Sequence, residues 1–335
     1  MKIICTKSNL VKGVNVVSKA VPSKTTMPIL ECILIDAKIF SEIVRKLPDN
    51  EVVIECDNNL QTTITCEKAK FNISCKSGED FSYLPFVEKT ETITLSQFTL
   101  KEIIRQTIFS IADNDSNKLM TGELFQIQDN MLKVVSLDGH RISIRKTELK
   151  DVYQSRKVVV PGKTLMEVSK ILSGEAESEV TISFTNNHIV FEFDNTVVVS
   201  RLIEGEYFRI DQMLSSDYET KVKINKKEFL NCIDRATLLV KEGDKKPIII
   251  NILDDVMELK IKSQIGSMNE EIMISKEGRD LLIGFNPKFL IDALRVIDDE
   301  EVTLYLMNPK APCFIKDDKE NYIYLILPVN FNAVA

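Results

Sequence analysis

The sequence predicts an α+β protein of three tandem domains, over residues 1–89, 90–216 and 217–335. Three observations predict this class. One helix pattern recurs three times, a second kind of helix opens each third of the chain, and strands of period two follow both kinds. A chain of 335 residues is also long enough to form a hydrophobic core in each domain.

The recurring helix pattern combines a small residue, a lysine, and apolar positions spaced three and four residues apart. This spacing places the apolar side chains on one face of a short helix. Each copy leads through an acidic turn into an alternating strand, which predicts a strand with one buried face. The copies are residues 37–47, 162–172 and 287–297, and their strands begin at Glu51, Glu179 and Glu301.

The second kind of helix lies near the start of each third, after a short strand. We predict these helices over residues 8–20, 97–111 and 226–240. Hairpin-like strands follow them, for example 124–127, 131–136 and 142–146. The repeating unit is therefore a strand, a helix and several strands, used about twice per domain.

The first domain is short near Ala37 by about 30 residues, the size of a few strands of typical length. Equivalent helix positions are Leu100 and Leu165 in the middle domain and Phe229 and Phe289 in the last. Leu10 and Phe40, their counterparts in the first domain, are separated by only about half as much sequence. Either the protein is natively short here, or the sequence omits a segment and is numbered across the gap. We favour the second interpretation, because a domain cut to this length would leave open strand edges, which natural proteins usually cover.

Composition excludes several classes of protein. A hydrophobic content of 44% and a charged content of 28% are ordinary for a soluble chain, and no apolar run is long enough to span a bilayer. Residues 1–5 resemble a strand and not a secretion signal, so we expect a cytoplasmic location. The seven cysteines form no C-x-x-C pair, which favours reduced thiols. The two histidines, His140 and His188, are far apart and without neighbouring cysteine pairs, so we expect neither a metal site nor a cofactor.

Residues 158–164 resemble a phosphate-binding loop, because a strand leads into Gly162-Lys163-Thr164 and a helix. That motif requires a glycine five residues before Gly162, and this position holds Lys157. Without further glycines the loop amides cannot surround a phosphate. We interpret the segment as one copy of the recurring helix.

Residues 138–141 place Asp138, Gly139, His140 and Arg141 between two alternating runs. Asp-Gly between such runs is typical of a hairpin turn. A catalytic pair of Asp138 and His140 is the weaker alternative, since the chain offers no nucleophile to act with it.

Positive charge is concentrated on the predicted helices. The six helices and their ends carry an excess of nine positive charges, whereas the whole chain has a net charge of −7. Lysine on surface helices can reflect helix propensity alone, but that does not explain the acidic remainder. We therefore favour a basic helical face that attracts an anionic partner such as nucleic acid.

Three short motifs carry a resemblance over the whole chain: Met-Pro-Ile-Leu at 27–30, Ser-Leu-Asp-Gly-His-Arg-Ile at 136–142, and Tyr-Leu-Ile-Leu-Pro-Val at 324–329. Together with three tandem domains, they resemble the bacterial DNA polymerase III beta subunits, the sliding clamps. The resemblance implies the DNA clamp fold, in which two protomers join head to tail in a ring with helices lining an inner face and antiparallel sheets outside. It implies a non-catalytic processivity factor of DNA replication that encircles duplex DNA without reading its sequence.

The resemblance also implies an apolar cleft, where replicative and repair polymerases, the clamp loader and other proteins dock a peptide of the Gln-Leu-x-Leu-Phe kind. The matching cleft positions are Met120, Leu137, Gly139, His140, Arg141, Ile142, Phe208, Met213, Leu325, Leu327, Pro328 and Val329, with Asn286 and Phe289 as a third-domain wall. The positions expected to contact DNA are Lys24, Asn114, Lys12, Lys101, Arg105, Lys163 and Lys170. The positions expected to close the dimer are Phe71, Ile73, Leu238 and Leu239.

The chain departs from the family pattern at the cleft. Phe208 stands where a proline is frequent, Asn330 stands where an arginine is frequent, and four residues follow Phe331. Peptide preference is therefore open. A second hypothesis also stays open, that of a clamp-derived interaction scaffold whose short first domain prevents ring closure.

Overall fold

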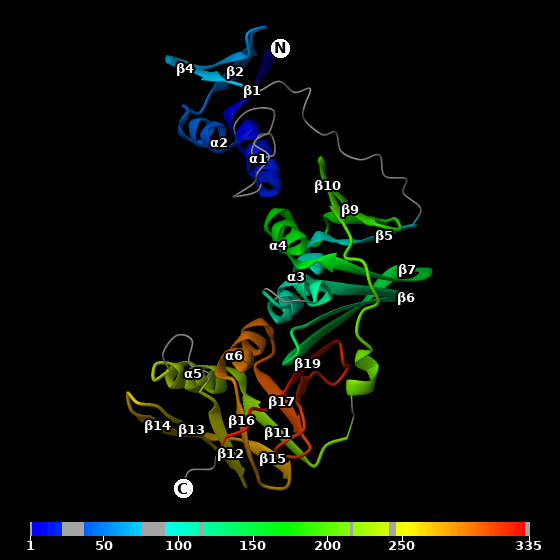
Figure 1. Cartoon of the computed structure of the whole chain (residues 1–335), viewed down its shortest axis with the longest axis vertical. Helices are drawn as coiled ribbons and strands as arrows, with labels where there is room; N and C mark the ends of the chain where they lie inside the picture. The colour runs from blue at the N-terminus through cyan, green and yellow to red at the C-terminus, as the bar shows by residue number, and fades with distance from the viewer. Residues whose placement is uncertain are drawn as a thin grey trace. The chain divides into compact units, whose positions relative to one another are not determined.

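The computed structural model describes residues 2–21, 37–75, 91–113, 117–214, 217–240 and 246–331. The chain divides into two compact units, Met1–Glu88 and Lys89–Ala335 (Figure 1). Each unit is described by itself.

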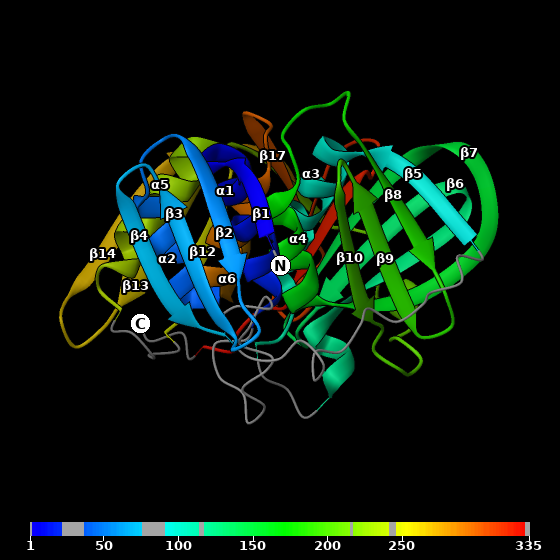
Figure 2. The same cartoon turned by 90° about the horizontal axis from the view of Figure 1, so that it is seen from above.

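The first unit packs two helices on one antiparallel sheet of order β1-β2-β3-β4. Figure 2 shows its four strands side by side, with the helices behind them. Val44, Val52 and Ile64 are completely buried between the two layers. The elements are β1 Lys2–Thr6, α1 Lys7–Val17, α2 Ala37–Lys46, β2 Glu51–Cys56, β3 Gln61–Cys66 and β4 Ala69–Ser74, with a 3-10 turn at Ser18–Ala20.

The second unit has two halves of similar element order. The first half contains β5 Glu91–Ser96, α3 Gln97–Thr107, β6 Gly122–Leu137, β7 Arg141–Pro161, α4 Gly162–Ile171, β8 Glu179–Phe184, β9 His188–Phe193 and β10 Thr196–Arg201, with 3-10 turns at Ile108–Ser110, Lys118–Thr121 and Ile210–Met213. The second half contains β11 Thr220–Asn225, α5 Lys226–Thr237, β12 Ile248–Leu253, β13 Val256–Lys262, β14 Ser267–Met273, β15 Ser275–Gly278, β16 Leu281–Phe285, α6 Pro287–Val296, β17 Glu301–Leu306, β18 Cys313–Lys316 and β19 Tyr322–Ile326.

One sheet joins the two halves. It has the order β15-β11-β17-β18-β19-β7-β6, and β19 pairs antiparallel with β7 from Tyr322↔Arg145 to Ile326↔Arg141. Two four-stranded sheets, β10-β9-β8-β5 and β14-β13-β12-β16, complete the unit. The helices pack in pairs, α3 on α4 and α5 on α6, and α3 also contacts α6. The junction between the halves therefore has a layer of strands and a layer of helices.

Helices α1, α3, α5 and α6 begin where the sequence supplies a side-chain cap, whereas α4 follows Pro161 and has none. Thr6, Ser96 and Asn225 each end a strand region, and their side-chain oxygens accept the backbone N–H three residues later. Asn286 caps α6 through the N–H of Lys288, with a proline at the first helical position. Such caps satisfy N–H groups that the first helical turn leaves without a partner.

The predicted helices and the hairpin turn are confirmed. The strands predicted at 131–136 and 142–146 are parts of the long strands β6 and β7, which pair up to Leu137↔Ile142 beside the turn. Their length was not predicted, because β6 and β7 stay paired from Leu137↔Ile142 to Gly122↔Pro161, across register shifts between Ile127 and Met131.

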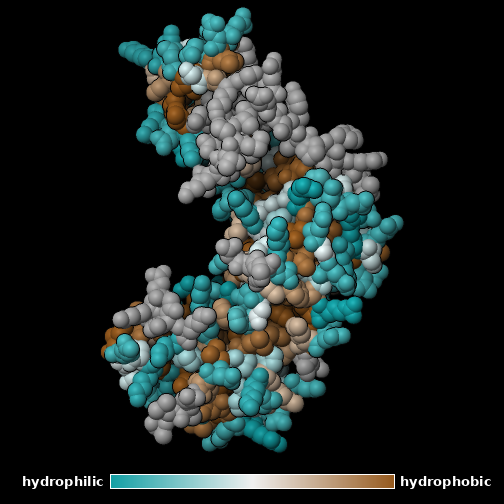
Figure 3. All heavy atoms as spheres, viewed as in Figure 1, coloured by the Kyte–Doolittle hydropathy of each residue, from teal (hydrophilic) through white to brown (hydrophobic). Residues whose placement is uncertain are grey.

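The first unit is simpler than either half of the second. Each of those halves contributes strands to two sheets, whereas all four described strands of the first unit belong to one. Helix α1 buries only Val14, although the corresponding helix α3 buries six residues. Figure 3 shows apolar residues open to view on this unit, and Ile4 and Ile39 are more than half exposed.

Every helix among the described residues is too short or too polar to pass through a lipid bilayer. The six cysteines in this part of the chain are free. No cluster of potential metal ligands occurs among the side chains that the structure describes.

Candidate peptide-binding cleft and basic helix face

The turn at residues 138–141 is held by its own aspartate. The Asp138 Oδ1 atom accepts the backbone N–H groups of His140, at 2.9 Å, and of Arg141, at 3.1 Å. Gly139 has a φ of +85°, a left-handed conformation that L side chains rarely adopt. The carboxylate is therefore part of the turn and is not free to act as a catalytic base.

Arg141 is the most constrained residue of the turn, with its side chain only 8% exposed. Its Nε donates to Asp138 Oδ2 at 3.0 Å, its Nη1 to Asp292 Oδ2 at 2.7 Å, and its Nη2 to the carbonyl of Phe109 at 2.5 Å. The guanidinium carbon lies 4.4 Å from the centre of the Phe289 ring. The sequence predicted a cleft wall and donor here, and three of the five N–H donors of this residue have partners within the protein.

Strand β19 brings the C-terminal run to this turn. Leu325 pairs with Ile142, and the N–H of Leu327 donates to the carbonyl of His140 at 2.9 Å. The N–H of Val329 then donates to the carbonyl of Gly284 at 2.8 Å. The turn and the run of residues 325–329 thus lie side by side, as the resemblance implies.

An apolar cluster forms the floor between these segments. Leu137, Ile142 and Leu325 are buried in it, and Met120 and Phe208 pack against its edge. Met213 and Leu327 expose 53% and 37% of their surface. Exposed apolar side chains such as these are suited to receive the apolar anchors of a peptide.

The two residues predicted as a third-domain wall have different surroundings. The Phe289 ring stacks on the exposed His140 ring with 6.1 Å between centroids, so Phe289 does lie at the turn. Asn286 uses its side-chain oxygen to cap α6, which gives it a structural task.

An open groove of about 760 Å³ runs along the segment 202–212, and most of its apolar lining belongs to the same apolar cluster. Leu124, Val159 and Ile203 line it together with charged residues such as Lys157 and Glu204. Phe208 belongs both to this groove and to the predicted cleft.

The predicted DNA-contact residues differ in their environment. Lys12 and Lys163 are exposed and form no ion pair within the described part of the chain. Lys170 pairs with Glu167 at 2.8 Å, and Lys101 donates to the carbonyl of Leu172 at 3.3 Å, at the end of α4. Lys24 and Asn114 lie outside the described residues.

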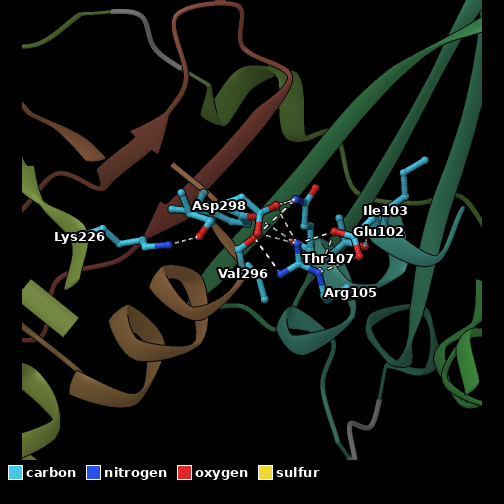
Figure 4. A network of polar contacts seen from close by, with 10 residues as sticks. Glu102, Ile103, Arg105, Thr107, Lys226, Val296 and Asp298 are labelled. Atoms are coloured by element: carbon cyan, nitrogen blue, oxygen red, sulfur yellow. Dashed lines mark hydrogen bonds and ion pairs between the residues drawn. The ribbon is translucent and has the colours of Figure 1, made fainter. Parts of the chain in front are cut away.

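Arg105 belongs to a polar network between α3 and the end of α6 (Figure 4). It pairs with Glu102 on its own helix and with Asp298, and its Nη1 donates to the carbonyl of Val296 at 3.2 Å. On the α6 side, Lys226 donates to the carbonyl of Ile297 at 2.6 Å. Arg105 therefore links the two halves of the unit, and this structural role is separate from the DNA contact predicted for it.

The predicted dimer residues are placed on surfaces of their own units. Phe71, which is 38% exposed, and Ile73 lie on β4, an edge strand of the first unit. Leu238, which is 79% exposed, follows α5, and Leu239 packs against the core beside it. An exposed leucine next to a partly buried one is suited to a contact with another molecule.

Sequence reasoning missed Asp292 and Phe109, which hold Arg141. They lie 151 and 32 residues from it in the chain. The spacing of three residues between Asp138 and Arg141 was the one local signal of an ion pair. It gave no indication that Arg141 also contacts Asp292 on α6.

Models of three domains of one protein family match successive parts of the chain. The DNA polymerase III beta subunit N-terminal domain matches residues 31–85, its central domain 94–208, and its C-terminal domain 211–330. Beta sliding clamps of Staphylococcus aureus and Staphylococcus epidermidis are each 35% identical over 300 residues, covering 89% of this chain and 79% of theirs. The chain belongs to the DNA polymerase III beta subunit family.

Solved structures of clamps agree with this assignment. A protein described as a DNA polymerase III beta subunit from Eubacterium rectale is 68% identical, with a TM-score of 0.96, over 99% of this chain and 100% of that one. The sliding clamp of Bacillus subtilis is 31% identical, with a TM-score of 0.94, over the same shares. These findings confirm the predicted fold class, that of three α+β clamp domains.

Family membership also decides between the hypotheses on function. A sliding clamp is a processivity factor of DNA replication and has no catalysis of its own, as predicted. The alternative of a scaffold that cannot close is not favoured, and an enzyme using Asp138 and His140 is excluded.

Proposed function

We propose that two copies of this chain close into a ring around duplex DNA in the cytoplasm. The ring tethers polymerases and other replication proteins, each of which docks a peptide at the cleft of residues 137–142 and 325–329. The observation that carries the cleft proposal is the shared apolar cluster. It gathers Leu137 and Ile142 from the turn with Leu325 from the last strand, β19. Met120 and Phe208 pack against this cluster, and Leu327, next to β19, exposes 37% of its surface, which a bound peptide would cover.

A labelled Gln-Leu-x-Leu-Phe peptide tests the cleft. We expect Met213→Glu and Leu327→Ser to weaken its binding at least about tenfold, because each removes an apolar contact worth about 1–3 kcal/mol. Val152→Ser is the matched control, since Val152 is 74% exposed on β7 and does not belong to the cluster. Equal affinities for all four proteins would reject this location for the cleft.

We propose that the exposed lysines of the helices face the DNA. Lys12 on α1 and Lys163 on α4 support this, because both are exposed and have charges unpaired by any described side chain. Non-specific contact with phosphates by such side chains allows the ring to slide. Retention of the protein on circular but not on linear DNA is the expected result, and a monomer lost equally from both would contradict ring closure.

We also propose the three domains 1–89, 90–216 and 217–335, with a segment the size of a few strands absent from the sequence near Ala37. The described strands of the first unit form one sheet, and Ile39 is exposed, which supports a missing layer. The staphylococcal alignment, which takes in 89% of this chain but 79% of the relative, also indicates a longer relative. The intact mass of the protein purified from its own organism tests this, and a mass of 38.1 kDa would contradict it.

A further inference from the structure

We propose that Arg141 is a positioning residue, which fixes the cleft by tying its turn to helix α6 through Asp292 and does not donate to the bound peptide. The inference rests on the proposed peptide-binding function of the cleft. It concerns how the cleft acquires its shape, and it makes the packing of α6 part of peptide affinity.

Arg141 uses three of its five N–H donors within the protein. A guanidinium carries five N–H donors on three nitrogens, and here each nitrogen already donates to an acceptor. One face of the group lies against the Phe289 ring, and the Phe109 ring centre is 5.4 Å from its carbon atom. With 8% of the side chain exposed, little of the group is open to a peptide.

The partners of Arg141 come from three separate elements. Asp138 belongs to the turn itself, Phe109 follows α3, and Asp292 lies on α6. The side chain therefore joins the turn to the helix layer of both halves of the unit. Because the His140 carbonyl of the same turn accepts the N–H of Leu327, the position of the turn also sets the position of the C-terminal edge of the cleft.

The charges explain why the arrangement is rigid. Arg141 lies between two carboxylates with side-chain exposures of 14% for Asp138 and 22% for Asp292. Removing one partner of such a poorly solvated group leaves the other without full compensation, so the turn is expected to shift. A surface ion pair would be screened by water and would not have this effect.

Substitution of Asp292 separates positioning from direct donation. If Arg141 donated to the peptide, Asp292→Asn would leave its charge in place or free it, and affinity would hold or rise. If Arg141 positions the turn, Asp292→Asn should weaken binding although Asp292 lies outside the predicted cleft. Arg141→Lys keeps the charge but loses the fork of donors, so it should have a similar effect.

The experiment measures the affinity of a labelled Gln-Leu-x-Leu-Phe peptide for the full chain and its variants. We expect Asp292→Asn and Arg141→Lys each to weaken binding about tenfold. The double variant should weaken binding by less than the product of the two single fold-changes, as for residues of one network. Asp234→Asn is the control, because Asp234 forms the exposed ion pair with Arg295 of the same helix α6, at 3.3 Å. It should change affinity less than about twofold.

Amide hydrogen exchange provides a readout that does not depend on the peptide. Asp292→Asn should speed exchange at Leu327, whose N–H bonds to the turn, and leave Val329 unchanged, whose N–H bonds to Gly284. Unchanged affinity and unchanged exchange at Leu327 in Asp292→Asn would overturn the inference. A wild-type chain that binds no peptide would instead overturn the proposed cleft, and exchange at Leu327 would still decide the role of Arg141.

Discussion

Arg105 of α3 and Asp298, beyond the end of α6, form an ion pair with 2.9 Å between Nη2 and Oδ2. The pair spans 193 residues of sequence and joins the two halves of the longer unit. The hydrogen bond to Glu102, and then the charges of Glu102 and Asp298, raise the pKa of Arg105 above its usual range. A cation predicted to serve DNA is therefore also a structural link.

The DNA contribution of Arg105 should be smaller than that of Lys163. Lys163 is exposed on α4 and has no ion-pair partner among the described residues, so Lys163→Gln removes a cation available to phosphate. We expect it to lower the slope of log affinity against log salt concentration by up to about 1, and Arg105→Gln to lower it by much less. Equal slopes for the two variants would show that Arg105 contacts phosphate despite its network.

The free energy of unfolding should fall more in Arg105→Gln than in Lys163→Gln, the reverse of the order expected for DNA binding. Arg105→Gln removes donors to Glu102, Asp298 and the Val296 carbonyl, so we expect a loss of about 1–2 kcal/mol in urea unfolding. Asp298→Ala should lose less than about 1 kcal/mol, because the Asp298 side chain is 73% exposed. Lys163→Gln is the control, with no expected change.

Glu123 should make stability depend on pH. It is completely buried on β6, neither carboxylate oxygen has a hydrogen-bond partner within the described residues, and burial raises its pKa to about 8. Between the ordinary pKa of about 4.5 and about 8, the folded state keeps a proton that the unfolded state has lost. The free energy of unfolding should therefore fall as pH rises through this window and level off above it.

The substitution Glu123→Gln isolates this effect. At pH 8 the variant should have a free energy of unfolding in urea more than about 1 kcal/mol above that of the wild type. At pH 4.5 the two should differ little. Tyr207 nearby stays protonated throughout, because burial and then the charge of Glu123 raise its pKa. The exposed Glu204→Gln is the control, and a wild-type pH profile in Glu123→Gln would place the titrating group elsewhere.

Leu238 should be needed for the dimer. Its side chain is 79% exposed after α5, and replacing it with aspartate removes an apolar contact of about 2 kcal/mol at each interface of the ring. We expect Leu238→Asp to sediment as a monomer at concentrations where the wild type is a dimer. Val152→Asp, with a similarly exposed valine at 74%, should remain dimeric.

Substitution of Gly139 should lower stability for a conformational reason alone. A Cβ atom there would meet no atom within 4 Å, but the φ of +85° is strained for any L residue. We expect Gly139→Ala to lose about 1 kcal/mol of stability in urea unfolding. Gly174→Ala is the matched control, since Gly174 also has open space but no left-handed φ, and it should be neutral or slightly stabilising.

The sequence by itself determined the local elements. The pattern of 287–297 predicted α6, Asp138-Gly139 predicted the turn, and the spacing of repeats predicted several units of one kind, because periodicity and capping act over a few residues. Only the tertiary structure decided what the charged residues do. Arg141 and Arg105 look alike as free cations in the sequence, and each acquires a carboxylate partner from the α6 region, which is remote in the chain. Such pairing depends on how β7, β19 and α6 pack, which is a property of the whole fold and not of any short stretch of chain.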